Sequence, residues 1–186
     1  MLQGVAVGVF GFLRRNRHER AAYALYGAAV AAAREPLLYD GLGVPDTVDG
    51  RFDLVGLHAF LLIRRLTALP APGPALAQAV FDAMFNDMDV NLRESGVGDL
   101  SVGRKVRTMW EAFHGRCAAY QAALDAGDVD ALTAALVRNV WRGAPAAGAA
   151  DLARIVLEQD AHLAQQRLDA LARGEASFIA PGQARA

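Results

Sequence analysis

The feature that most limits the fold of this chain is the helical spacing of its apolar residues, which recurs along nearly the whole length. No stretch shows the sustained alternation of apolar and polar residues that is typical of a β-strand. Short segments rich in proline and glycine separate the apolar runs, such as PAPGP at 70–74 and GAPAAGAAD at 143–151. The sequence therefore predicts an all-α fold, a single compact bundle of about five to seven helices.

These breaks also set the expected helix boundaries and the domain organisation. We expect helices over about 18–34, 46–69, 74–94, 103–126, 129–142 and 150–173. Asp46 or Thr47 can cap the second helix, and Gly127 and Asp128 end one helix and start the next. We expect three parts: an apolar and basic segment over 1–17, a helical domain over 18–142, and an Ala-rich linker, C-terminal helix and loose tail over 143–186.

The composition limits the classes of function. At 186 residues the chain is long enough for one domain with a real core, and its net charge of −1 gives no argument for a nucleic-acid partner. Cys117 is the one cysteine, so no intramolecular disulfide can form, and its context of small and apolar residues favours a packing role. Neither Gly-rich nucleotide-binding fingerprint is present.

The N-terminus combines an uncharged, mostly apolar stretch over 4–13 with four arginines, Arg14, Arg15, Arg17 and Arg20. The stretch is about half the length of a membrane span, and its charges follow the apolar part, the reverse of a signal peptide. Two interpretations stay open: residues 1–20 form an interfacial anchor on an anionic membrane, or they are a frayed terminus.

The sequence contains one weak pattern of possible metal ligands. Glu111 and His114 form a Glu-x-x-His pair on one helix face, as in di-iron bundles, but such sites need two pairs and further carboxylates. The nearest second match, Glu158 with His162, has a different spacing. We therefore expect a solvated helical pair, and no metal, although a ferritin-like metal protein stays as an alternative.

The remaining polar candidates give no catalytic arrangement. Asp87 and Asp89 are two residues apart on a helix and point in nearly opposite directions. The pattern around Asp82 is typical of a solvent-exposed helix face. His58 lies alone in the apolar run LVGLHAFLLI, which predicts a core histidine bonded to a backbone carbonyl or a neighbouring polar group. We expect no catalytic residue and no cofactor.

Charge and apolar side chains are segregated in the middle of the chain. Residues 81–99 hold five acidic residues against one arginine, and 101–116 hold four basic residues against one glutamate. A helical hairpin would set these strips side by side, either for mutual screening or as a polarised docking surface. An apolar groove is expected from Phe81, Phe85, Met88, Met109, Trp110 and Phe113; most of these side chains can equally belong to the core.

Three blocks of the sequence resemble one family. They are LYGAAVAAAREPLLY with GVPDTVDGRFDLVGLHAFLLIRRL, FDAMFNDMDVNLRESGVGDLSVGRKVRTMWEAFHGR, and LVRNVW. Together, over about residues 21–142, they resemble the ubiquinol–cytochrome c reductase chaperone family, whose members include the mitochondrial assembly chaperone that binds cytochrome b and shorter alphaproteobacterial relatives. The C-terminal third matches only loosely.

The resemblance implies a non-enzymatic, all-helical assembly factor for the cytochrome bc1 complex, with newly made cytochrome b as its partner. A small partner subunit, the ribosome and a peripheral location on the cytoplasmic face of the inner membrane are further expectations. The charged residues expected to contact a partner are Asp46, Asp49, Arg51, Asp53, Asp87, Asp89, Asp99, Arg104, Lys105, Arg107 and Arg116. Arg51 and Asp53 either pair with Arg107, Lys105 or Asp87 across the bundle or meet the client. A lipid- or quinone-binding carrier is the alternative from another class.

Overall fold

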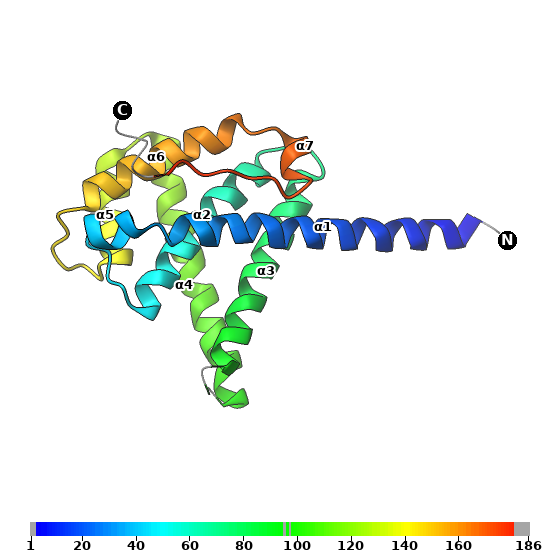
Figure 1. The fold of residues 1–186 in the computed structure, drawn as a ribbon, viewed down its shortest axis with the longest axis horizontal. Helices are drawn as coiled ribbons and strands as arrows, with labels where there is room; N and C mark the ends of the chain where they lie inside the picture. The colour runs from blue at the N-terminus through cyan, green and yellow to red at the C-terminus, as the bar shows by residue number, and fades with distance from the viewer. Residues whose placement is uncertain (1–2, 95, 97, 181–186) are drawn as a thin grey trace.

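The computed structural model describes the backbone of residues 3–94, 96 and 98–180, and the side chains of these residues except 3–17, 99 and 100. Within these residues the chain is helical, without a strand, which confirms the all-α prediction (Figure 1). The elements are α1 (Gln3–Ala33), the π-helical turn η1 (Leu37–Gly41), α2 (Val48–Thr67), α3 (Gly73–Glu94), α4 (Asp99–Ala126), α5 (Val129–Val140), α6 (Ala149–Gln165) and α7 (Leu168–Leu171).

The helix α2 is the centre of the bundle and packs against α1, α3, α4, α5 and α6. Its side chains Leu54, Leu57 and Leu62 are fully or almost fully buried. Because helices surround α2 on several sides, its sequence is apolar nearly all round, with no wide polar face. His58 is buried in the same helix and its Nδ1 lies 2.8 Å from the carbonyl oxygen of Leu54, which confirms the core histidine.

The polar segment before α2 builds the start of this central helix. The Oγ1 atom of Thr47 accepts a hydrogen bond from the backbone N–H of Gly50 at 3.1 Å, so Thr47 is the N-cap. Asp49 lies in the first turn, where a negative charge interacts favourably with the positive end of the helix dipole. Asp46 pairs with Arg51 and closes this turn from outside.

Two helices differ from their expected extents. The first begins at Gln3 rather than near residue 18, so α1 is one continuous helix of 31 residues. The last expected helix, over 150–173, is divided into α6 and α7 at Gln166, whose backbone is extended and whose carbonyl oxygen accepts a hydrogen bond from Arg65 at 2.7 Å. The break places both Leu163 and Leu171 in the core.

Two aromatic side chains on helices of the bundle are exposed. Tyr23 on α1 is 46% exposed and Trp110 on α4 is 44% exposed. Tyr26 and Phe113, three residues further along each helix and so displaced by about 60° around its axis, are buried in the bundle.

The described part of the C-terminal segment is held against α6. After α7 the chain runs in an extended conformation back alongside α6, coloured red in Figure 1. Ile179 is held by two hydrogen bonds to the side chain of Gln159. Residues 181–186 of the predicted tail lie outside the described residues.

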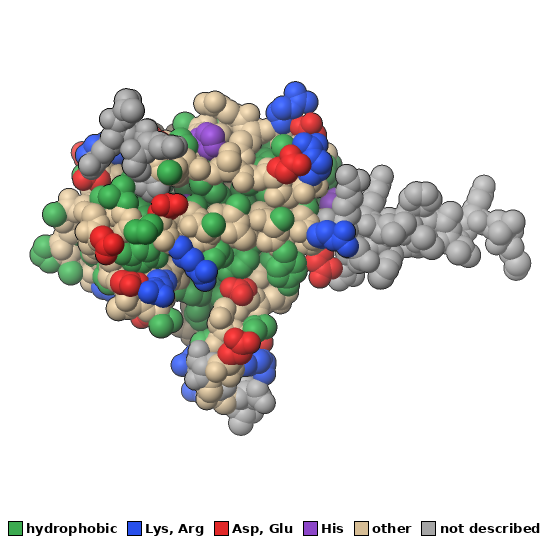
Figure 2. Space-filling model, viewed as in Figure 1, with side chains coloured by type: hydrophobic (Ala, Val, Ile, Leu, Met, Phe, Trp, Pro, Cys, Tyr) green, Lys and Arg blue, Asp and Glu red, His purple; other side chains and the backbone are tan. Residues whose placement is uncertain are grey.

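The pair α3 and α4 projects from the bundle as a hairpin (Figure 1). Figure 2 shows lysine, arginine and acidic side chains together at the end of this hairpin, while hydrophobic side chains cover much of the bundle above it. In the part of the chain that the structure describes, no helix is both long enough and apolar enough to cross a membrane.

Candidate functional site: an aromatic cleft between four helices

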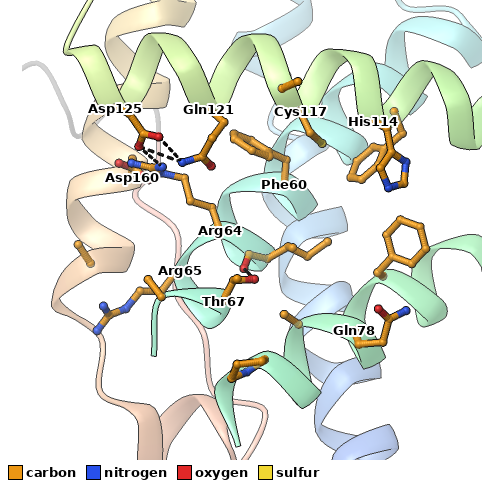
Figure 3. A pocket seen from close by; sticks show the side chains of 18 of the residues that line it. Phe60, Arg64, Arg65, Thr67, Gln78, His114, Cys117, Gln121, Asp125 and Asp160 are labelled. Carbon is orange, nitrogen blue, oxygen red and sulfur yellow. Dashed lines mark hydrogen bonds and ion pairs between the residues drawn. The ribbon is translucent and has the colours of Figure 1, made fainter. Parts of the chain in front are cut away.

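An open cleft of about 1100 Å³ lies between the C-terminal half of α2, the N-terminal half of α3, the C-terminal half of α4, and α6 (Figure 3). We name it the aromatic cleft, because Phe60, Phe81, Trp110 and Phe113 line it. Trp110 is the most exposed of these side chains, and its ring lies 3.9 Å from that of His114. The cleft thus presents an accessible aromatic surface on otherwise well-packed helices.

One arginine organises the polar rim of the aromatic cleft. The Nε of Arg64 donates to Asp160 on α6 at 3.0 Å, and its Nη1 donates to Asp125 on α4 at 2.6 Å (Figure 3). The side chain of Gln121 donates to the same Asp125 carboxylate. Arg64 therefore ties three helices together at the cleft, and charge-assisted pairs of this kind fix the geometry of the rim.

A second cleft of about 660 Å³ lies between α1, η1, the N-terminal half of α2 and the C-terminal half of α3. Its apolar lining includes Phe52, Met88 and Met109, and its rim carries Arg34 and Arg51. We name it the second cleft.

The six side chains expected to form one groove are divided between these two clefts. Phe81, Trp110 and Phe113 line the aromatic cleft, whereas Met88 and Met109 line the second cleft. Phe85 lines neither cleft; its ring packs on Phe81 at 4.6 Å and on Phe113 at 6.1 Å. The structure therefore does not bring the six side chains together in one groove. The side chains alternate around α3 and α4 and so point to different neighbours.

Asp53 pairs with other partners than those expected for it. Its side chain is 3% exposed and forms ion pairs with Arg116 on α4 and, at 2.7 Å, with Arg142 just after α5. Burial raises the pKa of the Asp53 carboxyl above its usual range, although the two guanidiniums act in the opposite direction. Arg142 adopts a positive φ of 55°, uncommon for a residue other than glycine, next to this pair. Asp53 and Arg116 thus join α2 to α4 and α5 inside the bundle.

Arg51 also differs from its expected pairing. It binds Asp46 in the preceding loop, and among the described side chains it forms no ion pair across the bundle. Asp46 and Arg51 are both more than half exposed in their side chains. Contact of these residues and of exposed Asp49 with a client stays a prediction.

The two charged strips of α3 and α4 each contain an ion pair that lies within the helix. Arg93 pairs with Asp89 and Arg107 pairs with Glu111, each one turn away on the same helix. Among the described side chains no ion pair joins α3 to α4. Arg104 and Lys105 are exposed and have no ion pair with any described side chain. A docking role for this strip stays a prediction.

The other acidic candidates have different environments. Asp87 accepts a hydrogen bond from the Tyr26 hydroxyl on α1 at 2.8 Å. Burial, followed by this contact, raises the pKa of Tyr26 well above its ordinary value. The side chain of Asp99 lies outside the described residues.

The Glu-x-x-His pair is engaged in local contacts. Glu111 accepts from Arg107, and the Nδ1 of His114 lies 2.9 Å from the backbone oxygen of Trp110. The structure, within its described part, contains no group of three or more histidine, cysteine or acidic side chains placed to hold a metal ion. Among these described side chains the pair has none of the further ligands that the ferritin-like alternative requires.

Cys117 is half-buried on α4 at the edge of the aromatic cleft. Burial raises the pKa of its thiol to about 12, so the reactive thiolate is scarce near neutral pH. This environment agrees with the packing role expected from the sequence.

Sequence reasoning missed Arg64 and Arg142, which hold the aromatic cleft and Asp53 in place. Arg64 could have been noticed as the first charge after ten uncharged residues of a buried helix, because a charge beside a core run needs a partner. No comparable signal marks Arg142, since its pairing with Asp53 depends on the packing of α5.

Comparison with known proteins finds a matching family and a solved structure with a similar fold. The model of the family described as ubiquinol–cytochrome C chaperone matches residues 40–178, beyond the limit of 142 expected from the sequence. A crystal structure of the Cbp3 homolog from Brucella abortus is similar with a TM-score of 0.83 and 36% identity, over 94% of this chain and 98% of that chain. No curated protein matched. With three quarters of its length matched by the family model, this chain belongs to the ubiquinol–cytochrome c chaperone family.

Proposed function

We propose that the protein is a non-enzymatic assembly chaperone that binds newly made cytochrome b and supports biogenesis of the cytochrome bc1 complex. Its family supports the chaperone role, and the aromatic cleft is the observation that supports a direct contact with an apolar client. An open groove lined by aromatic side chains suits the apolar face of a helix, which is a common mode of peptide recognition.

The client contact divides into an apolar and a polar part. Trp110 and Phe81 contact the apolar face of a cytochrome b helix before partner subunits cover it, and Trp110 is the side chain that loses most exposed area there. The exposed Arg104 and Lys105 on the projecting hairpin meet polar or acidic segments of the same client. Rim charges of this kind set orientation and association rate more than affinity.

Membrane contact is part of the proposal. The helix α1 extends beyond the bundle at its N-terminal end (Figure 1), and residues 4–13 carry no charge before the arginines that begin at Arg14. A peripheral position on the cytoplasmic face of the inner membrane would bring the aromatic cleft close to newly inserted cytochrome b. A small partner subunit and the ribosome stay predictions from the family.

A quantitative pull-down with matched variants tests this function. The tagged protein is isolated from its native membranes after crosslinking, and copurified cytochrome b is measured by mass spectrometry for the wild type, Trp110→Ala and Tyr23→Ala. Trp110 and Tyr23 are almost equally exposed, at 44% and 46%, but only Trp110 lines the aromatic cleft.

We expect Trp110→Ala to lower cytochrome b recovery about tenfold, the loss of one interface hot spot of about 1.4 kcal/mol. Tyr23→Ala should leave recovery unchanged. Charge reversal of Lys105 and Arg107 to glutamate should weaken recovery without unfolding the protein. Absence of cytochrome b from the wild-type sample, in cells that make the complex, would contradict the proposal; bound lipid or quinone extracted from the protein would then favour the carrier.

A further inference from the structure

The last described residues, 175–180, form an extended segment that we name the C-terminal strap. It begins after Gly174, which has a φ of 85° and lies so close to α1 that a Cβ atom there would be 2.9 Å from the Cβ of Ala24. The strap then runs between α1 and α6 (Figure 1). Residues 176–180 make no backbone–backbone hydrogen bond with the rest of the described chain. Side chains of the bundle therefore hold the strap.

Two glutamines, Gln159 of α6 and Gln166 directly after α6, each bind both backbone groups of one strap residue. Gln159 donates to the carbonyl oxygen of Ile179 at 2.6 Å and accepts from its N–H at 2.9 Å. Gln166 does the same with Ser177, at 2.7 and 3.1 Å. Gln159 lies within α6 and Gln166 lies at its C-terminal end, where the backbone becomes extended, and both side chains reach the strap. Their contacts are to the backbone, and such contacts do not depend on the sequence of the strap.

One aromatic side chain supplies the apolar contact. Phe178, between the two clamped residues, is half-buried against the core, and its ring meets the buried ring of His58 edge-on at 5.5 Å. Ser177, on the opposite side of the strap, is exposed, and its hydroxyl bonds His162. The surface thus accommodates an extended chain with one ring pointing inward.

The burial of Gln159 indicates a built peptide site. This residue is only 2% exposed, and within the described part of the chain the hydrogen bonds of its amide group go to the strap. A buried amide without partners costs free energy, so this position requires an extended backbone opposite it. Any extended backbone of suitable shape satisfies the same two groups.

We propose that Gln159, Gln166 and His58 form a binding site for an extended segment of a partner polypeptide carrying one aromatic residue, and that the C-terminal strap occupies this site until the segment replaces it. The strap is suited to exchange because its residues 176–180 are held by contacts with side chains, and Glu175 at its start alone bonds the backbone of α7, at Ala170. This site lies apart from the aromatic cleft, since none of its three residues lines the cleft, and it does not depend on the identity of the client.

The test uses the full chain with a weakened strap. The double variant Ser177→Pro and Ile179→Pro removes the two backbone N–H groups of the strap that donate hydrogen bonds to the glutamine side chains. The probe is a fluorescein-labelled peptide of residues 175–182, EASFIAPG, followed by fluorescence anisotropy. We expect the double variant to bind the peptide at least tenfold more tightly than the wild type, whose own strap competes.

Two controls distinguish specific binding at the glutamine side chains from nonspecific binding of the peptide. Adding Gln159→Leu to the double variant should abolish binding, and so should replacing the phenylalanine of the peptide by alanine. A peptide with tyrosine at that place and altered flanking residues should bind within a few-fold. Equal binding to the wild type and the double variant, or binding that survives Gln159→Leu, would overturn the proposal. Concentration-dependent dimerisation of the double variant without peptide binding would also overturn it and identify a second copy as the occupant.

Hydrogen exchange on the unmodified protein gives a test that does not depend on the folding of the variant. We expect the N–H groups of Ser177 and Ile179 to exchange at least tenfold faster than that of Leu57 in the core, because the strap opens by itself. Exchange of all three at one common rate would mean that the strap opens only when the protein unfolds, and the proposal would fail.

Discussion

Replacing Gly50 by alanine should destabilise the protein, although the same change in most helices stabilises it. Gly50 lies in the first turn of α2, directly against the backbone of Pro45. A Cβ atom built there would overlap the Pro45 carbonyl oxygen and lie 3.1 Å from its carbonyl carbon. That carbonyl oxygen also accepts the N–H of Thr47 at 2.9 Å, so it is fixed in place. The segment before α2 therefore has to move.

The expected change in the free energy of unfolding is the sum of two opposing contributions. Alanine in place of glycine within a helix normally raises the free energy of unfolding by about 0.5–1 kcal/mol. Forcing an extra atom into a packed backbone contact costs about 1–3 kcal/mol. We expect Gly50→Ala to lower the free energy of unfolding by about 1–2 kcal/mol, which shifts the urea midpoint down by roughly 0.5–1 M.

The assay is urea unfolding at 25 °C followed by circular dichroism, with Gly115→Ala as the matched control. Gly115 lies within α4, and a Cβ atom there would meet no atom within 4 Å. The Gly115→Ala variant should therefore have a free energy of unfolding about 0.5–1 kcal/mol higher than the wild type. A Gly50→Ala protein as stable as the wild type would refute the argument that Pro45 and α2 require this close approach.

Three further predictions concern stability and reactivity. Thr47→Ala should lower the free energy of unfolding by about 1 kcal/mol through loss of the α2 N-cap, measured in the same urea assay. Burial lowers the pKa of His58, so the unfolded chain takes up its proton more readily below about pH 6.5; stability should fall there by up to about 1.4 kcal/mol per pH unit. The variant His58→Gln should lack that part of the pH slope, and an unchanged slope would exclude a buried neutral imidazole. Cys117, with its pKa raised to about 12, should react with iodoacetamide at pH 8 at least a hundredfold more slowly in the folded protein than in urea.

The fold was largely predictable because its signals are local. The Pro/Gly segments and the caps at Thr47 and Asp128 place most helix ends within a few residues of the observed ones, since a cap acts on the turn that follows it. The division of α6 from α7 was not predictable in this way. It depends on Arg65, a residue distant in sequence, which binds the carbonyl oxygen of Gln166.

The candidate site was predictable only in part, because it depends on which side of each helix faces which neighbour. Phe81 and Trp110 were identified as groove residues from their helical spacing, but spacing does not say that Met88 faces a different cleft. The pairing of Asp53 was missed because Arg142 follows a helix remote in sequence and takes an uncommon backbone conformation. Long-range pairs of this kind follow from packing, and periodicity carries no information about them.

The central claim, that the aromatic cleft receives newly made cytochrome b, is tested most directly by site-specific photocrosslinking. A photoreactive amino acid replaces Trp110 in the aromatic cleft or, as control, Val90 on α3, which is 50% exposed and lines neither cleft. After irradiation of living cells, the attached polypeptides are identified by mass spectrometry. We expect cytochrome b to be crosslinked from position 110 and much less from position 90. Equal crosslinking from both positions, or none from position 110 in cells that make the complex, would contradict the proposed function of the cleft.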